Sequence, residues 1–395
     1  MELQTADSTS CFRRVGPFAE GTLRTYSERR KARLMGGAAT GLALLLASGG
    51  VAFAQETPAG EEPTEVEEVV VTGIRRGIEN SISAKRTNSN IVEVVSAEDI
   101  GKLPDVSIAE SLARLPGLTA QRLNGRAQVI SVRGMSPDFT TALLNGREQV
   151  STGDNRGVEF DQYPSELLSG VVVYKTPDAA LLGAGLAGTA DLRTVRPLAF
   201  GRQAIALNYR YEWNDIGALN AGSDDSGHRW TFSYIDQFMD GNLGVAFGVS
   251  NMSSPYQAER FNAWGYPDAP GGADVIGGAK PFVQSSVLDR TGYMAAIEFS
   301  PNDRFKTSLD LFYSEFEFTE YLRGIELPLF WSSATLQPGF TTSNGLVTQG
   351  TYTGVKGVVR NDANTRDSEL FSIGWNTQFD ITDNWSGEFD LSQSK

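Results

Sequence analysis

The stretch AIALNYRYEW, from Ala204 to Trp213, alternates between large apolar side chains and small or polar ones. Successive side chains of a β-strand point to opposite faces of its sheet, so this pattern predicts a strand with one apolar face. The same alternation recurs in RWTFSYIDQF, NLGVAFGVS, YMAAIEF, FKTSLDLFYSEF, FSIGWNTQFDI and WSGEFDLS. We therefore expect antiparallel strands over residues 200–395, the part of the chain that holds all of these stretches.

The connections between these stretches distinguish a membrane barrel from a soluble sandwich. Strands of soluble sheets usually run about five or six residues. Outer-membrane barrels instead combine strands of about ten residues with short turns at one end and long loops at the other. Here the tight turns lie near Asp240, Pro301 and Asp383, and the long connections between them cover residues 214–227, about 253–289 and about 319–368. This order favours transmembrane β-barrel strands.

The alternation also predicts which side chains face the lipid. We expect Trp230, Phe247 and Trp375 to point outward, and Arg229 and Gln237 to lie on the opposite face. The seven stretches cannot close a barrel, and an open edge in lipid would leave backbone groups without hydrogen bonds. We therefore expect the chain to be the front part of a longer protein.

Residues 91–199 show a mixed α/β pattern. IVEVV (residues 91–95) predicts a strand, SAED (96–99) a capping box, and DVSIAESLARLPG (105–117) a helix. Asp105 or Ser107 would cap this helix, and Pro116-Gly117 would end it. Further strands are expected in AQVISVRG (127–134), TTALLNGRE (140–148) and SGVVVYK (169–175), with one helical turn in PSELL (164–168). The region predicts a small α/β domain.

The composition excludes several functions. The formal net charge of −14 disfavours nucleic acid as a partner, because phosphate binding needs a basic surface. Cys11 and His228 are the only cysteine and histidine, which leaves no Cys/His metal site, so we expect no metal and no cofactor. DANTRD (362–367) lacks the glycine and distal glutamate of a calcium loop and is expected to be a solvated loop. Paired acids such as Glu315 and Glu317 are expected to be solvated, so no enzyme activity is predicted.

The N-terminus predicts export. Basic residues from Arg24 to Arg33 precede the apolar run GLALLLASGG (41–50) and an A-x-A site at residues 52–54, as in a cleaved signal peptide over residues 1–54. Residues 55–90 follow as an expected flexible segment, because their first part is acidic and contains Pro and Gly. This segment carries EEVVVTG (67–73), a strand-forming stretch with no strand nearby to pair with.

Four stretches resemble the TonB-dependent receptors of Gram-negative outer membranes. EEVVVTG resembles their TonB box, and VRGMSPDFTTALLNGRE (132–148) resembles their plug pattern of [IV]-R-G, a strand and a D/N-G-R turn. PSELLSGVVVYKTPDA (164–179) and GLAGTADLRT (185–194) resemble the later plug motifs. Ser169-Gly170 and Ala190-Asp191-Leu192 stand where an acid and an Asn are common, which points to the Caulobacter/Xanthomonas-type subfamily.

The resemblance implies an α/β plug domain at residues 91–199 inside a barrel of about 22 strands, of which residues 200–395 supply the first. It also implies active import across the outer membrane. The partners would be TonB with its inner-membrane energising complex, outer-membrane lipid and a small-molecule substrate. The box would add to TonB as an edge strand. The predicted TonB-binding residues are Glu67, Glu68, Val69, Val70, Val71, Thr72 and Gly73.

The substrate is less well defined than the mechanism. The predicted substrate-binding residues are Asp138, Phe139, Asp154, Asn155, Arg156, Trp264 and Trp331, in loops expected to face outward. Aromatic rings that stack on sugars, together with the subfamily resemblance, favour an oligosaccharide, with a ferric siderophore next. The alternative for these rings is that they pack the loops on one another. A passive porin-like channel and a surface-exposed binding protein remain alternative functions.

Overall fold

The computed structural model describes residues 77–96, 107–179, 181 and 185–395. The signal peptide, the TonB box at residues 67–73, Cys11 and most of the SAED capping box lie outside these residues. Within the described part of the chain, no helix is long and apolar enough to cross a membrane.

The N-terminal part of the described chain is the predicted α/β domain, which we call the plug. A helix over residues 77–87 precedes its strands. The strands are β1 (Val92–Ser96), β2 (Leu118–Leu123), β3 (Arg126–Val132), β4 (Thr140–Leu144), β5 (Arg147–Glu148), β6 (Leu168–Tyr174) and β7 (Gly188–Thr194). The helical segments are α3 (Ile108–Leu112), η1 (Pro137–Phe139), η2 (Phe160–Gln162), η3 (Ser165–Leu167) and α4 (Pro197–Phe200).

Five of these strands form one sheet in the order β1-β6-β7-β4-β5, with only the β4–β7 pair parallel. The β2–β3 hairpin forms a separate two-stranded sheet. The apolar core includes Ile108 and Leu112 of α3, Ile130 of β3 and Leu192 of β7. The sequence patterns predict β1, β3, β4, β6, the helical turn at η3 and helix α3, but not β2 and not the helix over residues 77–87, which lies in the segment expected to be flexible.

Helix α3 begins where the sequence predicts. The Oγ of Ser107 accepts a hydrogen bond from the backbone N–H of Ala109 at 3.2 Å, and the same hydroxyl donates to the carbonyl oxygen of Ala127 at 2.8 Å. Ser107 is therefore the cap, and it also ties the helix to strand β3. Gly117, with a φ of 75°, allows the turn into β2.

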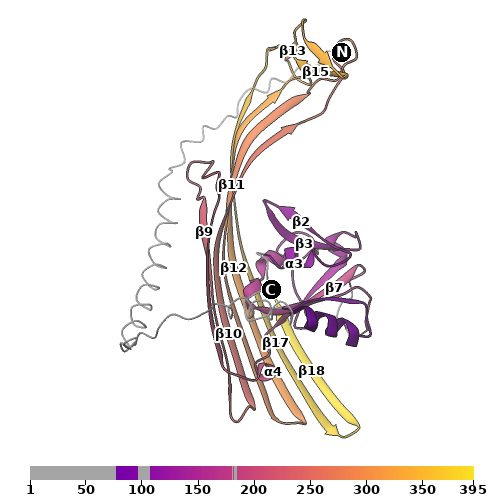
Figure 1. Cartoon of the computed structure of the whole chain (residues 1–395), viewed down its shortest axis with the longest axis vertical. Coiled ribbons are helices and arrows are strands. Elements are labelled where there is room, and N and C mark those ends of the chain that lie inside the picture. Colours follow the sequence, from indigo (N-terminus) through magenta and orange to yellow (C-terminus); the bar gives the residue numbers. More distant parts are fainter. Residues whose placement is uncertain (1–76, 97–106, 180, 182–184) are drawn as a thin grey trace, which may run out of the picture. The chain divides into compact units, whose positions relative to one another are not determined.

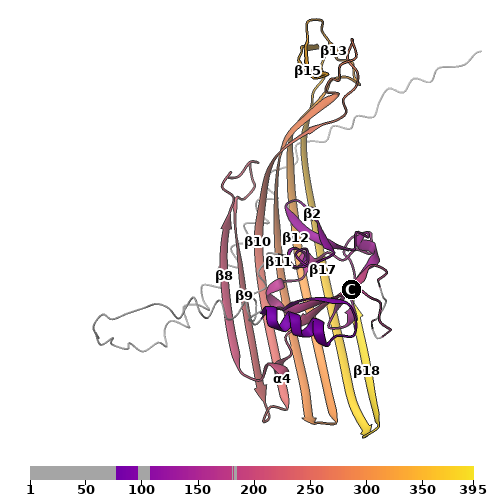
Figure 2. The ribbon, with the colours of Figure 1, turned by 45° about the vertical axis from the view of Figure 1, so that its right-hand side comes forward.

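Residues 204–394 form the predicted row of antiparallel strands, drawn side by side in Figures 1 and 2. The order β18-β17-β12-β11-β10-β9-β8 pairs each long strand with its neighbour in sequence. The tight turns at residues 239–242, 303–304 and 383–384 are confirmed. The strands are β8 (Ala204–Trp213), β9 (Ser226–Phe238), β10 (Leu243–Ala263), β11 (Gly278–Asn302), β12 (Phe305–Pro328), β17 (Val358–Thr382) and β18 (Trp385–Ser394).

The two faces of this sheet differ as the alternation predicts. Phe247 and Trp375 are 41% and 47% exposed on the outward face, whereas Arg229 is 6% exposed on the other. Gln237 also lies on the inward face, where its Nε2 donates to the carbonyl oxygen of Pro197 at 2.8 Å. The assignment of the two faces is therefore confirmed.

The predicted extents of two long loops are wrong. Strand β10 continues to Ala263 and β11 starts at Gly278, so the connection between them covers only residues 264–277. Strand β12 continues to Pro328 and β17 starts at Val358, which leaves residues 329–357. That connection carries the short strands β13 (Thr335–Leu336), β14 (Thr341–Ser343), β15 (Leu346–Gln349) and β16 (Tyr352–Thr353). The added strand segments are polar on both faces, so they show no period-two signal although their backbones pair.

The prediction that DANTRD is a loop is wrong for the same reason. Residues 362–367 lie within β17 and pair in register with β12, from Leu322 opposite Asp362 to Glu317 opposite Asp367. Polar side chains on both faces hide this strand from a hydrophobicity pattern.

Candidate functional site

Two clusters of buried charges join the plug to the inward face of the long strands. The first starts at the Asn145-Gly146 turn between β4 and β5. Both residues have positive φ, 54° and 80°, and Asp191 accepts a hydrogen bond from the N–H of Gly146 at 2.9 Å. This turn places the next residue, Arg147, against the inward face of strands β12 and β18.

Arg147 bridges two carboxylates on two different strands. Its Nη1 donates to Oδ2 of Asp310 at 2.6 Å, and its Nη2 and Nε donate to Asp390 at 2.9 and 3.0 Å. Arg196, just before α4, adds a second ion pair to Asp310 at 2.8 Å. Burial acts to lower the pKa of Arg147, but the two carboxylates outweigh it and raise the pKa above its ordinary value. The guanidinium therefore stays charged.

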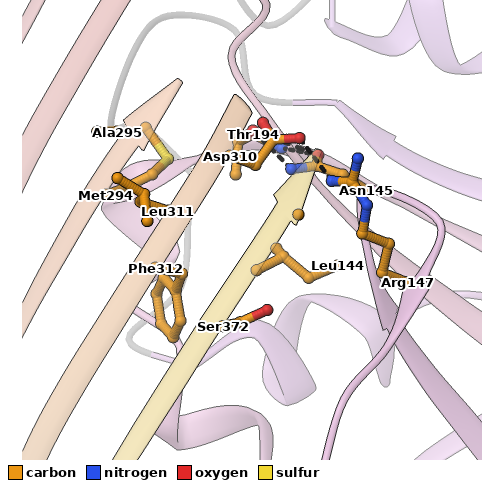
Figure 3. A pocket seen from close by; sticks show the side chains of 11 residues that line it. Leu144, Asn145, Arg147, Thr194, Met294, Ala295, Asp310, Leu311, Phe312 and Ser372 are labelled. Carbon is orange, nitrogen blue, oxygen red and sulfur yellow. Dashed lines mark hydrogen bonds and ion pairs between the residues drawn. The ribbon is translucent and has the colours of Figure 1, made fainter. Parts of the chain in front are cut away.

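Figure 3 shows the side chains that line the small space beside Arg147. The small pocket beside it has a volume of about 10 Å³ and lies between plug residues such as Asn145 and strand residues such as Phe312. That space holds one water at most. Gly374 stands where a Cβ would collide with the guanidinium of Arg147, so a larger residue there would force the guanidinium to shift. The contact is a packed seam with no room for a substrate.

The second cluster reverses the charges, because the plug supplies the acid. The Oε1 of Glu166, in η3, accepts from Nη1 of Arg229 at 2.7 Å, and its Oε2 lies 3.7 Å from Nη2 of Arg290. Arg290 also donates to the backbone carbonyls of Tyr163, at 3.3 Å, and Asp161. Burial acts to raise the pKa of Glu166, but Arg229 and Arg290 outweigh it and hold the pKa below its ordinary value.

Both clusters are held by non-covalent contacts that can be broken and formed again. Removing one partner of a buried ion pair is strongly destabilising, at about 3–5 kcal/mol, because the other charge stays buried without compensation. The geometry can therefore hold the plug firmly against the strands in one arrangement. It offers no activated nucleophile, and no group of three or more Cys, His, Asp or Glu among the described residues could hold a metal.

The predicted substrate residues of the plug come together at one place. Asp138 accepts a hydrogen bond from the backbone N–H of Arg156 at 3.1 Å, which joins η1 to the loop that carries Asp154 and Asn155. Phe139 is 43% exposed beside them. The carboxylate of Glu159 fixes the base of this loop, because its Oε2 accepts from the Oγ of Ser151 at 3.0 Å and from Nε2 of Gln162 at 3.1 Å.

The predicted substrate residues of the strand loops form a separate group. The ring of Trp264 lies against Gly278, and the ring of Trp331 lies against Gly265 and Gly277. Phe330 meets Trp331 edge to face, with ring centroids 5.8 Å apart. Both tryptophans thus pack on loop backbone, although Trp331 stays 61% exposed. Contact of these residues with a substrate remains a prediction.

The sequence patterns do not reveal the two ionic clusters. The alternation places Arg229 on the inward face but indicates no partner for it, and the N-G-R turn is recognised only as a motif. The partners are 63 residues apart for Glu166 and Arg229, and 243 for Arg147 and Asp390. The sequence feature that could have indicated these clusters is a charged residue at an inward position of a strand whose other inward residues are small and polar.

Comparison with known proteins identifies the plug. Residues 84–190 match the family model of the TonB-dependent Receptor Plug Domain. Residues 84–190 therefore form a plug domain of the TonB-dependent receptor type, and the long antiparallel strands follow it in the chain. The subfamily, the total number of barrel strands and the domain boundaries remain predictions.

Two curated relatives and one solved structure illustrate the similarity. The chain is 32% identical over 151 residues to a probable TonB-dependent siderophore receptor PirA of Acinetobacter baumannii, covering 34% of this chain and 18% of the relative. It is 34% identical over 125 residues to the ferric enterobactin receptor PirA of Pseudomonas aeruginosa, covering 27% and 16%. The alignments thus span less than a fifth of each relative.

The outer membrane transporter YddB of Escherichia coli aligns with 76% of this chain and 47% of its own, with a TM-score of 0.40 and 16% identity. That agreement adds nothing to the assignment, which rests on the plug.

Proposed function

We propose that this chain is part of an active importer of a scarce small molecule across the outer membrane. The observation that carries the proposal is the plug at residues 84–190, held against the strands by Arg147 and Glu166. A channel closed by a domain fixed with buried ion pairs does not open by diffusion alone. It needs work from outside to release the plug.

TonB would supply this work. The predicted box, residues 67–73, would add as an edge strand to TonB, because backbone pairing needs no particular side chains. The chain between the box and β1 would transmit the pull from the inner-membrane energising complex to the plug. Export through a cleaved signal peptide and residence in the outer membrane, with Phe247 and Trp375 against lipid, belong to the same proposal.

The substrate class is narrowed by the named relatives. Both are siderophore receptors by name, which favours a ferric siderophore. The aromatic loop residues Trp264 and Trp331 keep an oligosaccharide as the second candidate, although their rings pack on loop backbone in this structure. Import of either substrate would involve binding and movement and no covalent chemistry.

Growth and uptake tests on a panel of ferric chelates and oligosaccharides distinguish these candidates. The strain would lack the full-length gene, and the same strain carrying the gene back on a plasmid is the control. We expect uptake of one ferric chelate to disappear in the deletion strain and to return with the plasmid. Loss of oligosaccharide uptake alone would assign the second class. Unchanged uptake of every compound would contradict the proposal.

A further inference from the structure

Strands β10, β11 and β12 continue past the plug and present one face to it. The tip of the β2–β3 hairpin identifies this face: Gly125 lies against the ring of Tyr256, and Asn124 bonds Glu320 and Gln284. Residues paired across strands share a face. Arg260 lies four positions beyond Tyr256 and pairs with Phe282, which is two positions from Gln284, so it lies on the same inward face.

Arg260 differs from Lys280 and Arg360, two other cations on this face, in its partners. Lys280 and Arg360 both bind the carboxylate of Glu326, at 3.3 and 2.9 Å. Within the described chain, Arg260 has no carboxylate within ion-pair distance. It is exposed, its guanidinium lies 5.3 Å from the ring centroid of Phe282, and its Nη1 donates to the neutral Oε1 of Gln284 at 2.7 Å.

These features suit the binding of an anionic group. A guanidinium presents several donors in a rigid fork, which matches the oxygens of a carboxylate or a phosphate. A ring beneath it holds the cation in place without neutralising it. A cation without an ion-pair partner gains from an anionic ligand without exchanging an existing ion pair.

Gln284 connects this arginine to the plug. Its side chain is only 2% exposed, and its amide nitrogen donates to Oδ1 of Asn124 at 2.7 Å and also to Glu320. Asn124 in turn donates to Oε2 of Glu320 at 2.9 Å. The Gln284 oxygen has Arg260 as its donor. If Arg260 turned toward a ligand, that buried oxygen would lose its hydrogen bond, and the amide would no longer be held in place.

The hairpin tip at the end of this chain of contacts is a tight turn. Asn124 and Gly125 have φ values of 51° and 74°, as an Asn-Gly hairpin turn requires. The turn is held on the strands by Asn124 and by the ring of Tyr256. A shift of the Gln284 amide therefore acts directly on the hairpin turn between β2 and β3, the part of the plug that contacts the long strands.

We propose that Arg260 binds an anionic group of the substrate, a carboxylate or a phosphate, and that Gln284 passes this event to the plug hairpin over β2 and β3. The inference rests on the proposed function, since it assigns the substrate an anionic group and gives its binding an effect on the plug. Arg260 is then both a specificity residue and, through Gln284, a positioning residue for Asn124.

The test uses hydrogen exchange of the full-length protein in detergent, with citrate and inorganic phosphate as separate probes at millimolar concentration. Potassium chloride at equal ionic strength is the control. We expect one or both anions to speed exchange at the amides of β2 and β3 by about tenfold. A response to citrate alone assigns a carboxylate, and a response to phosphate alone assigns a phosphate.

Two variants separate the proposal from general charge effects. Arg260→Gln removes the guanidinium, so exchange at β2 and β3 should no longer respond to either anion. Arg366→Gln is the matched control, because Arg366 also lies over a ring, Phe316, at 5.4 Å and takes no part in the contacts of Gln284. It should respond as the natural protein does.

Three results would overturn the proposal: no response to either anion, an equal response in Arg260→Gln, or loss of the response in both variants. Energy-dependent uptake is measured separately in cells. A failed anion response with intact TonB-dependent uptake would thus refute the role of Arg260 and leave the proposed transport standing.

Discussion

At the scale of single residues, Glu166 is the plug side chain on which the second cluster depends. It is 7% exposed and compensates both Arg229 and Arg290. We expect Glu166→Gln to destabilise the contact between the plug and the long strands by about 3–5 kcal/mol, because two buried guanidiniums lose their anion. Hydrogen exchange of the plug amides in the full-length protein measures this change.

Glu148→Gln is the matched control for that substitution, because Glu148 is an exposed glutamate at the end of β5. It should leave the exchange of plug amides within error of the natural protein. Equal exchange in Glu166→Gln and Glu148→Gln would show that the buried pair does not fasten the plug.

The lowered pKa of Glu166 also predicts a dependence on pH. A carboxyl whose pKa is lower in the folded state contributes stability above its ordinary pKa of 4.5 and loses that contribution as the pH falls through the lowered value. The plug should therefore loosen on acidification below about 4.5. Denaturant midpoints measured from pH 7 downward check this. The drop should be smaller in Glu166→Gln, and an equal drop in both proteins would assign it to other groups.

At the scale of the element, strand β10 carries the prediction that the sheet spans a membrane. Phe247 and Phe261 both point outward from it, but they lie at different heights. An arginine on the lipid face costs about 2–4 kcal/mol at the bilayer midplane and about 0–1 near its edge. We expect Phe247→Arg to destabilise the full-length protein in lipid vesicles by the larger amount and Phe261→Arg by the smaller. Equal effects would argue against a bilayer at the height of Phe247.

The long strands also show how far a sequence pattern reaches. Alternation located every long strand and both of its faces. The strand segments next to the tight turns have one apolar side, and this requires a period of two residues. Alternation failed in the strand segments farther from the tight turns, where polar residues occupy both faces, Glu259 and Asn361 on one and Arg260 and Asp362 on the other, and only backbone pairing continues. It also missed β2, a strand whose exposed residues give no apolar stripe. The ionic clusters depend on distant pairs, which no local pattern encodes.

At the scale of the whole molecule, substrate binding and the driving force act at different places. The substrate would meet the plug near Asp138 and Arg156 and the strands near Arg260. The energy would enter through the box at residues 67–73 and act on the ion pairs of Arg147 and Glu166. A passive channel would have no use for the box, since its flux follows the gradient of the substrate alone.

The most direct test deletes residues 68–73 from the full-length protein and measures binding and accumulation of the labelled substrate in the same cells, with and without an uncoupler. The account predicts unchanged binding to the cells and no energy-dependent accumulation. The natural protein should accumulate substrate until the uncoupler is added. Normal energy-dependent accumulation by the deletion variant would contradict the central claim that TonB, acting through this box, drives import.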